Sequence, residues 1–135
     1  MIKKLQNNKL EISKKKYSVF QASYKVEAKL LNATNFSPLK RPLNDYVISN
    51  TDFFGYLKNK ELAGVIEIDH KNSSTHIRSL VVNPVFFRQG IVRKLMEFVL
   101  NTFNRNLFIV ETGLEDAPAS KLYKKFGFIE VNQWD

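Results

Sequence analysis

The sequence predicts a single domain, residues 1–135, of the α/β (α+β) class, with a mixed, mostly antiparallel central sheet flanked by about four helices. Three observations predict this fold class. The length of 135 residues is typical of one domain, and the chain has no internal repeat or interdomain linker. Three consecutive strand-like runs lie between residues 53 and 82, and helix-like and strand-like runs alternate after them. A meander followed by crossover connections gives a mixed sheet with helices packed on it.

The N-terminal part is predicted to hold a charged segment and two helices. Residues 1–16 contain six lysines and one glutamate, which is +5 of the net charge of +8, and we interpret them as a solvated basic face. Residues 17–31 form a helix, which Ser37-Pro38 interrupts, and a second short helix begins near Pro42, because proline is tolerated in a first turn. The apolar positions that recur at helical spacing in the first helix are Phe20, Tyr24, Ala28 and Leu31.

Three strands are predicted in the middle of the chain. Residues 53–57 and 62–69 are rich in aromatic and aliphatic residues and are joined by the hairpin-like turn Lys58-Asn59-Lys60. A second turn at residues 71–74 leads to a third strand over residues 75–82. These connections are short enough for antiparallel pairing of consecutive strands.

The C-terminal part alternates helix and strand. An apolar stripe predicts a helix over residues 90–103, and the continuous apolar run 107–111 predicts a strand buried on both faces. A further helix over residues 117–126 ends at Gly127 as a left-handed cap, and residues 128–134 form the last strand. The inward positions of the last helix are Ala119, Leu122, Tyr123 and Phe126.

Composition excludes several function classes. The chain has no cysteine and only two histidines, so we expect no disulfide, no thiolate zinc site, no cysteine nucleophile and no bound metal. No apolar run reaches the ~18 residues of a membrane helix, and residues 1–16 lack the apolar core of a signal peptide, so we expect a cytoplasmic protein without a membrane partner. The basic excess leaves two further interpretations open, which are steering of an anionic small ligand and, less favoured, nucleic-acid binding.

One segment has the pattern of an anion site. Residues 80–93 are predicted to run from a strand through a glycine-containing loop to a helix N-terminus. Free backbone N–H groups and the helix dipole meet at such a point, and Gly90 lets the backbone approach a bulky phosphate closely. Arg88 and Arg93 flank the loop and can add charge-assisted hydrogen bonds. An ordinary strand–loop–helix turn with exposed arginines is the alternative for this segment alone.

A second segment, residues 116–128, reads DAPASKLYKKFGF, and the two segments together resemble motifs of the GNAT superfamily of N-acetyltransferases. The first resembles the acetyl-CoA pyrophosphate loop of that family and the second its Asn-x-x-Ala-x-x-Leu-Tyr-x-x-x-Gly-Phe element. The order of elements extends the likeness to most of the chain, with one final strand where the family has two. Phe87, Val92 and Asp116 depart from the family pattern.

The resemblance implies acetyl-CoA as co-substrate and direct transfer of its acetyl group to a primary amine, from a small molecule or a protein. The backbone of residues 80–82 would pair with the pantetheine arm, and the amides of residues 88–93 would hold the pyrophosphate. Tyr123 would protonate the departing thiolate, and the Val82 N–H is our candidate for polarising the carbonyl oxygen. The implied cofactor-binding residues are Leu80, Val81, Val82, Arg88, Gln89, Gly90, Ile91, Val92, Arg93, Asp116, Ala119 and Tyr123.

The general base is left open by the sequence. Glu67 is the first candidate, because burial in an apolar strand would raise its pKa, and His76 and Glu111 are alternatives. The acceptor amine is unidentified, and either a monomer or a homodimer is compatible with the shortened sheet edge. A non-catalytic acyl-CoA-binding or sensor module of the same fold is the alternative to an enzyme, suggested by the departures at Val92 and Asp116.

Overall fold

The computed structural model describes residues 1–71, 74–103, 107–110, 123–125 and 127–128. In this described part, five strands form one sheet in the order β1-β2-β3-β4-β5. The first four pair antiparallel with their neighbours, and β5 pairs parallel with β4, which confirms the predicted mixed, mostly antiparallel sheet. The strands are β1 (Ile2–Leu5), β2 (Asp52–Lys58), β3 (Glu61–Lys71), β4 (Ser74–Val82) and β5 (Leu107–Val110).

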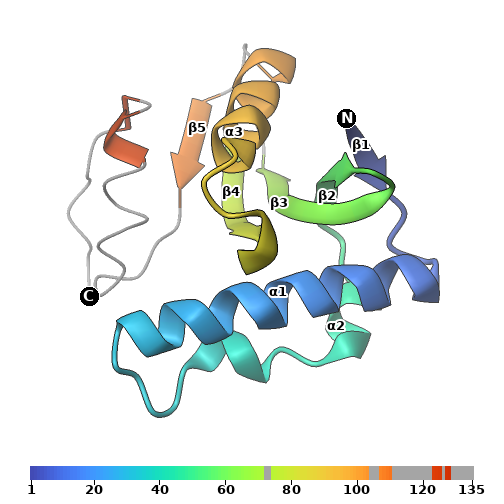
Figure 1. Ribbon diagram of the computed structural model, residues 1–135. Helices are drawn as coiled ribbons and strands as arrows, with labels where there is room; N and C mark the ends of the chain where they lie inside the picture. The colour runs from blue at the N-terminus through green and yellow to red at the C-terminus, as the bar shows by residue number, and fades with distance from the viewer. Residues whose placement is uncertain (72–73, 104–106, 111–122, 126, 129–135) are drawn as a thin grey trace.

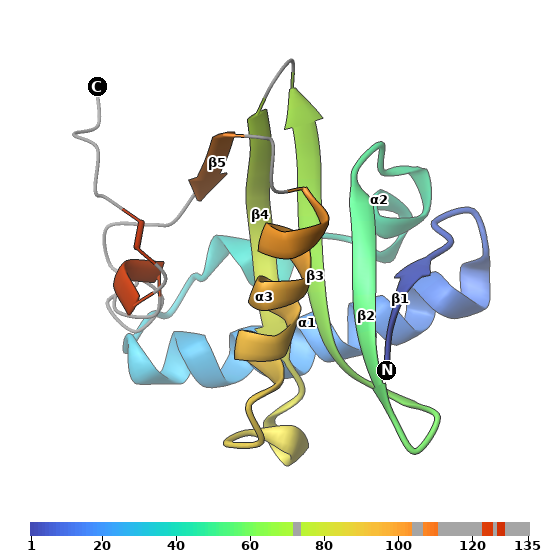
Figure 2. The same ribbon diagram turned by 90° about the horizontal axis from the view of Figure 1, so that it is seen from above.

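Helices cover both faces of the sheet. The helices α1 (Leu10–Leu30) and α2 (Leu43–Ile48) lie along one face, and α3 (Ile91–Thr102) lies on the other (Figures 1 and 2). Two short 3-10 turns precede α2 and α3, namely η1 (Ser37–Lys40) and η2 (Pro84–Phe86).

Strand β3 supplies both hydrophobic cores, because successive side chains of a strand point to opposite faces. Ile66 and Ile68 are fully buried beneath α3, in a cluster with Leu95. Val65 is fully buried on the other face, in a cluster with Phe20 of α1. Alternate residues of β3 therefore face opposite helical layers. Glu67 lies two residues after Val65 and faces the same layer, that of α1 and α2.

The N-terminal segment differs from the prediction. Residues Ile2–Leu5 form the edge strand β1, and α1 begins at Leu10 rather than at residue 17. The buried positions in the first two turns of α1 are Ser13 and Lys16, so hydrophobic spacing did not reveal this part of the helix. The interpretation of the segment as a solvated basic face is wrong for Lys16, which is fully buried.

The other described elements agree with the prediction except in one detail. The three central strands, α2 and α3 lie where they were predicted, and Gly127 has the predicted left-handed backbone with φ of +89°. In β5, however, Leu107 and Ile109 are 67% and 37% exposed, so the expectation of a strand buried on both faces is wrong. These two side chains lie on the outer face of the strand, whereas Phe108 and Val110, on the other face, pack toward the core under α3.

Several predicted features lie outside the described residues. They include the strand over 128–134 beyond its first residue, the shortened strand pair at that edge, and most of the helix over 117–126. The single-domain organisation stays a prediction. None of the described helices combines the length and the hydropathy that crossing a membrane requires.

Candidate functional site

Short-range contacts build the segment that links β4 to α3. The side-chain oxygen of Asn83 accepts a hydrogen bond from the Val85 N–H at 3.2 Å, which starts the η2 turn. Arg88 and Gly90 then adopt left-handed backbone, with φ of +64° and +73°, and α3 begins at Ile91. Glycine adopts this conformation freely, whereas a residue with a Cβ loses roughly 1 kcal/mol or more. The left-handed backbone at both positions reverses the chain just before the helix.

The backbone amides of residues 88–93 make no hydrogen bond to any other described residue. The first intrahelical hydrogen bond is donated by the Lys94 N–H to the Gly90 carbonyl, at 3.1 Å. These amides are the uncommitted donors that a helix N-terminus leaves, and the positive end of the helix dipole lies at the same place. The segment therefore has the donors and the field that bind a phosphate.

Glycine in β3 lets α3 sit close to the sheet. A Cβ at Gly64 would lie 2.8 Å from Cγ2 of Ile91, 3.2 Å from Cδ1 of Leu95 and 3.2 Å from the Val81 carbonyl oxygen. Because the first turn of α3 rests on this bare backbone, Gly64 fixes where the amides of the loop are held.

The surface beside the loop is open. A Cβ at Gly90 would meet no heavy atom within 4 Å, and Arg88 and Arg93 are exposed. Val92, the bulky departure from the family pattern, is half-buried and packs against the core under α3. The ammonium of Lys58, at the end of β2, donates a hydrogen bond to the side-chain oxygen of Gln89 and adds a positive charge at the rim of the loop.

Strand β4 has an edge free of described strand partners over its second half. The pairing with β5 ends at Ile77, whereas the pairing with β3 continues to Val82. The Asn83 N–H, just beyond β4, donates to the Ala63 carbonyl of β3 at 2.8 Å. Since hydrogen-bonded and non-hydrogen-bonded pairs alternate in antiparallel strands, the N–H groups of Leu80 and Val82 point away from β3, toward the open edge.

Tyr123 lies in a described helical turn near the end of the chain. Its side chain is 9% exposed and belongs to the core under α3, and its ring lies 6.0 Å from that of Phe128 in an edge-to-face arrangement. The Phe128 N–H donates to the Tyr123 carbonyl at 3.2 Å, which closes the turn around Gly127. Core packing and a role at the hydroxyl are compatible, because a tyrosine has an apolar body and a polar tip.

Glu67 lies on the opposite face of the sheet, in a cluster of donors from distant parts of the chain. Its carboxylate accepts two hydrogen bonds from the Arg41 guanidinium, at 2.8 and 3.1 Å. Two hydroxyl groups complete the set, that of Thr51 at 2.7 Å and that of Ser79 at 2.9 Å. The side chain of Glu67 is 4% exposed and that of Arg41 23%, so this is a buried ion pair.

The direction of the pKa shift of Glu67 is opposite to the prediction. Burial by itself raises the pKa of a carboxyl group, as the sequence argument assumed. The hydrogen bonds from Arg41, Thr51 and Ser79, together with the positive charge of Arg41, outweigh this effect and lower the pKa of Glu67. The expectation of a raised pKa is therefore wrong, and the role of Glu67 as a base stays a prediction.

A second buried charge lies in the same layer. The Lys16 ammonium donates to the Asn7 side-chain oxygen at 2.8 Å and to the Tyr46 carbonyl at 3.2 Å, and it lies 3.7 Å from the ring centroid of Phe53. Burial lowers the pKa of Lys16 to about 8, although the negative charge of Glu67 acts in the other direction.

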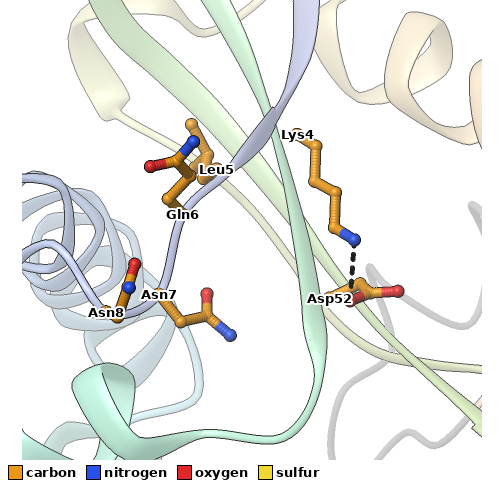
Figure 3. A pocket seen from close by; sticks show the side chains of 6 residues that line it. All are labelled: Lys4, Leu5, Gln6, Asn7, Asn8 and Asp52. Atoms are coloured by element: carbon orange, nitrogen blue, oxygen red, sulfur yellow. Dashed lines mark ion pairs between the residues drawn. The ribbon is translucent and has the colours of Figure 1, made fainter.

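Two of the hollows at the surface of the described part bear on the candidate residues. The first, of about 430 Å³, lies at the turn between β1 and α1 and is lined by Lys4, Asn7 and Asp52 among others (Figure 3). It lies at the opposite end of β2 from Lys58, which contacts the loop, and is therefore remote from the loop. The second, of about 350 Å³, has a wholly polar or charged lining, made of Arg41, Asp45, Ser49, Thr51, Glu67, Arg78 and Ser79.

The structure brings together part of the set that the sequence predicted. The loop residues 88–93 and the strand residues Leu80, Val81 and Val82 form one continuous segment. His76, one of the two alternatives to Glu67 as the base, lies in the half of β4 that pairs with β5. Asp116, Ala119 and Glu111 lie outside the described residues. The described residues contain no group of three or more His, Asp or Glu side chains placed to hold a metal ion.

Sequence reasoning missed the partners of Glu67. Arg41, Thr51 and Ser79 are 26, 16 and 12 residues away from it along the chain. No local pattern links them, and the one available signal was the need of a buried carboxylate for a cation. That signal predicts that a partner exists without naming it.

Comparisons with known proteins identify the family. Residues 21–134 match the family model described as acetyltransferase (GNAT) domain. The UPF0157 protein YqkA of Bacillus subtilis (strain 168) is 32% identical over 130 residues, which are 95% of this chain. The chain spans 38% of the length of that relative.

Solved structures share the fold. The PaiA N-acetyltransferase of Thermoplasma acidophilum, in complex with coenzyme A, is similar with a TM-score of 0.74 at 18% identity, over 100% of this chain and 93% of that chain. The ribosomal-protein-S18-alanine N-acetyltransferase of Escherichia coli is similar with a TM-score of 0.68 at 18% identity, over 98% and 80% of the two chains. At such identities the likeness shows the fold. With the family model matching most of its length, this chain belongs to the GNAT acetyltransferase family.

Proposed function

We propose that this protein is an acetyl-CoA-dependent N-acetyltransferase that moves an acetyl group directly to a primary amine of a small molecule or a protein. The observation that carries the proposal is the set of amides at residues 88–93, at the N-terminus of α3, which bond to no other described residue. Membership of the GNAT family and the fold shared with a coenzyme A complex support the same ligand.

The residues of the loop and of β4 fit acetyl-CoA. The amides of residues 88–93 would hold the pyrophosphate, with Arg88 and Arg93 adding positive charge at an open surface. The N–H groups of Leu80 and Val82, which pair with no described strand, would pair with the pantetheine arm along this edge of β4. No metal is needed, because a helix N-terminus neutralises the diphosphate.

The chain's own groups have distinct tasks in the proposed transfer. When bound, acetyl-CoA supplies a thioester that a neutral amine can attack, with formation of a C–N bond and loss of the C–S bond. The Val82 N–H would stabilise negative charge on the carbonyl oxygen, since it points toward the open edge of β4. Tyr123 would give its proton to the departing thiolate, because a phenol and a thiol have similar ordinary pKa values, and an ordered water would take the proton that the amine nitrogen loses.

A non-catalytic acyl-CoA-binding module is the second candidate. The observation that favours it is the state of Glu67, the first candidate base, whose carboxylate is engaged in four hydrogen bonds. Turnover separates the two candidates. Release of free CoA thiol with any amine of a panel supports the enzyme, and tight binding of CoA without turnover supports the module.

The test of the proposed function is a pair of substitutions at Gly90. Gly90→Asp places a negative charge among the amides and is expected to weaken CoA binding about 100-fold. Gly90→Asn is the matched control, because it has the same shape without the charge and tolerates left-handed backbone, so its affinity should fall by less than about tenfold. Isothermal titration calorimetry measures both affinities. Equal losses in the two variants, or unchanged affinity in Gly90→Asp, would contradict phosphate binding at the loop.

A further inference from the structure

The carboxylate of Glu67 has no acceptor capacity left for a substrate amine. A carboxylate offers about four lone-pair positions. Oε1 accepts from Arg41 and Ser79, and Oε2 accepts from Arg41 and Thr51, so all four are used. An amine in the neighbouring hollow would have to displace one of these donors before it reached the carboxylate.

A bulge in β4 completes this set of donors. Glu67 pairs with Ser79 and Ile68 pairs with Ile77, so Arg78 is an extra residue in β4. Ile77 packs under α3, whereas Ser79 reaches Glu67 on the opposite face. Residues two apart in a regular strand face the same side, so the bulge is what turns Ser79 toward Glu67. The bulge in β4 thus supplies one of the hydrogen-bond donors of the Glu67 carboxylate.

Arg41 connects Glu67 to residues 37–48, the segment that contains η1 and α2. It lies between η1 and α2, and its guanidinium is 3.5 Å from the Asp45 carboxylate and 4.2 Å from the ring centroid of Tyr46. The two hydrogen bonds to Glu67 join this guanidinium to β3, and it also lies 5.8 Å from the ring centroid of Phe53 in β2. This ion pair fastens residues 37–48 onto β3.

The fastened segment forms one wall of the polar hollow of about 350 Å³, and β4 forms another. Arg78 and Ser79 line the hollow and directly precede residues 80–82 of β4, where the N–H groups of Leu80 and Val82 point to the open edge of the strand. The position of residues 37–48 therefore sets the width of a polar space next to the proposed site of transfer.

We propose that Glu67 is a positioning residue, which through Arg41 holds residues 37–48 in place as a wall of the acceptor-amine pocket, and that it does not take the proton of the amine. The acceptor part of this inference rests on the proposed function. The polar lining makes a hydrophilic amine, rather than a long alkyl amine, the class of acceptor that fits.

Several charged or titratable groups face Glu67 and bear on any pH dependence measured at this site. The described groups come from α1, from the segment before α2, from α2 and from β4. They are Lys16, Tyr24, Arg41, Asp45, Tyr46 and Arg78.

The first experiment compares the wild-type chain with Glu67→Gln, using glycylglycine, spermidine, glucosamine and hexylamine as acceptors. With the best hydrophilic acceptor, we expect the KM for the amine to rise about tenfold, kcat to change less than about threefold, and CoA affinity to stay unchanged. The rise of kcat/KM with pH should keep the same midpoint in both proteins. A base would behave differently, with kcat falling by about 10²–10⁴-fold and loss of the pH-dependent rise. That result would overturn the inference, as would a preference for hexylamine.

A second pair of variants tests whether Glu67 acts through Arg41. Arg41→Lys keeps the charge but loses the two-pronged geometry, so its amine KM should also rise. The double variant Arg41→Lys/Glu67→Gln should show no further increase, because both changes break the same contact. Lys4→Met, which breaks the exposed ion pair with Asp52, is the control and should leave the amine KM unchanged. If the two increases in the amine KM added up in the double variant, the inference that Glu67 acts through Arg41 would be wrong.

Hydrogen–deuterium exchange separates this inference from the proposed function. Glu67→Gln should speed the exchange of backbone amides in residues 37–48 and leave those of α3 unchanged. Unchanged exchange in residues 37–48 overturns the positioning role even in an active enzyme. A wild-type chain that binds CoA but acetylates none of the amines overturns the proposed function, and faster exchange in the variant would then still support the wall held by Glu67.

Discussion

The loop at residues 88–93 and the cluster around Glu67 use polar groups in opposite ways. The loop exposes backbone donors that bond to no other described residue, whereas the carboxylate of Glu67 is buried and fully bonded. Buried polar groups are normally satisfied, so a saturated cluster indicates a part that holds other parts in place. Donors that are left open at the surface indicate a place where a ligand completes the bonding. The same chain thus separates its binding backbone from its positioning side chains, one on each face of the sheet.

Breaking the buried ion pair should have the largest effect on stability. Arg41→Met leaves the carboxylate of Glu67 buried without its cation, and we expect the free energy of unfolding at pH 7 to fall by about 3–5 kcal/mol. The loss should shrink as the pH falls through about 4, where the carboxyl group of the unfolded chain becomes protonated. The sign follows from the pKa: the lowered pKa of Glu67 stabilises the wild-type fold above the unfolded value, and this contribution disappears in acid. Urea unfolding followed by circular dichroism measures both quantities.

The control for this prediction is the exposed ion pair between Lys4 and Asp52, drawn in Figure 3. Its atoms are 3.5 Å apart, and its side chains are 62% and 34% exposed. Exposed pairs contribute about 0–1 kcal/mol, so Lys4→Met should have little effect. If Arg41→Met proved as mild as Lys4→Met, the cluster around Glu67 would not hold the segment as we infer.

A substitution in β3 should disturb the loop from beneath. Gly64→Ala places a methyl group 2.8 Å from Ile91, and such overpacking costs about 1–3 kcal/mol. Because the first turn of α3 must move, we expect CoA affinity to fall several-fold as well. Gly55→Ala is the matched control, since its Cβ would lie 2.6 Å from Leu62 in the other core, far from α3. It should cost similar stability and leave CoA affinity unchanged; equal losses of affinity would mean that the loop responds to global destabilisation only.

The two regions also differ in how far the sequence could predict them. The loop follows from local rules, because Asn83, Pro84 and Gly90 set the turns and the helix start within a few residues. The central strands and α3 were predicted for the same reason, since their periodicity is contained in each element. The partners of Glu67 come from the segment before α2, from the residue that precedes β2 and from β4, and only the folded chain brings them together.

The N-terminal helix shows the limit of hydrophobic spacing. The first turns of α1 bury Ser13 and Lys16, which a search for apolar residues reads as surface. The Ser13 hydroxyl donates to the Asn7 carbonyl at 3.0 Å, and Lys16 has its own acceptors in the same place. Polar residues occupy the inward positions here because the turn before the helix offers carbonyl groups rather than apolar surface.

Lys16 provides the most specific test of the buried cluster. Its pKa is about 8 in the folded chain and has the ordinary value of 10.5 in the unfolded chain. Between these two values the unfolded state binds more protons, so the contribution of Lys16 makes the fold more stable as the pH rises. The slope is at most about 1.4 kcal/mol per pH unit. Lys16→Met should remove it, and the difference in free energy of unfolding between the two proteins, measured from pH 7.5 to 10, reports it directly. A difference independent of pH would mean that the ammonium is hydrated despite its position beneath Phe53, and the buried polar layer would then be more open than its hydrogen bonds imply.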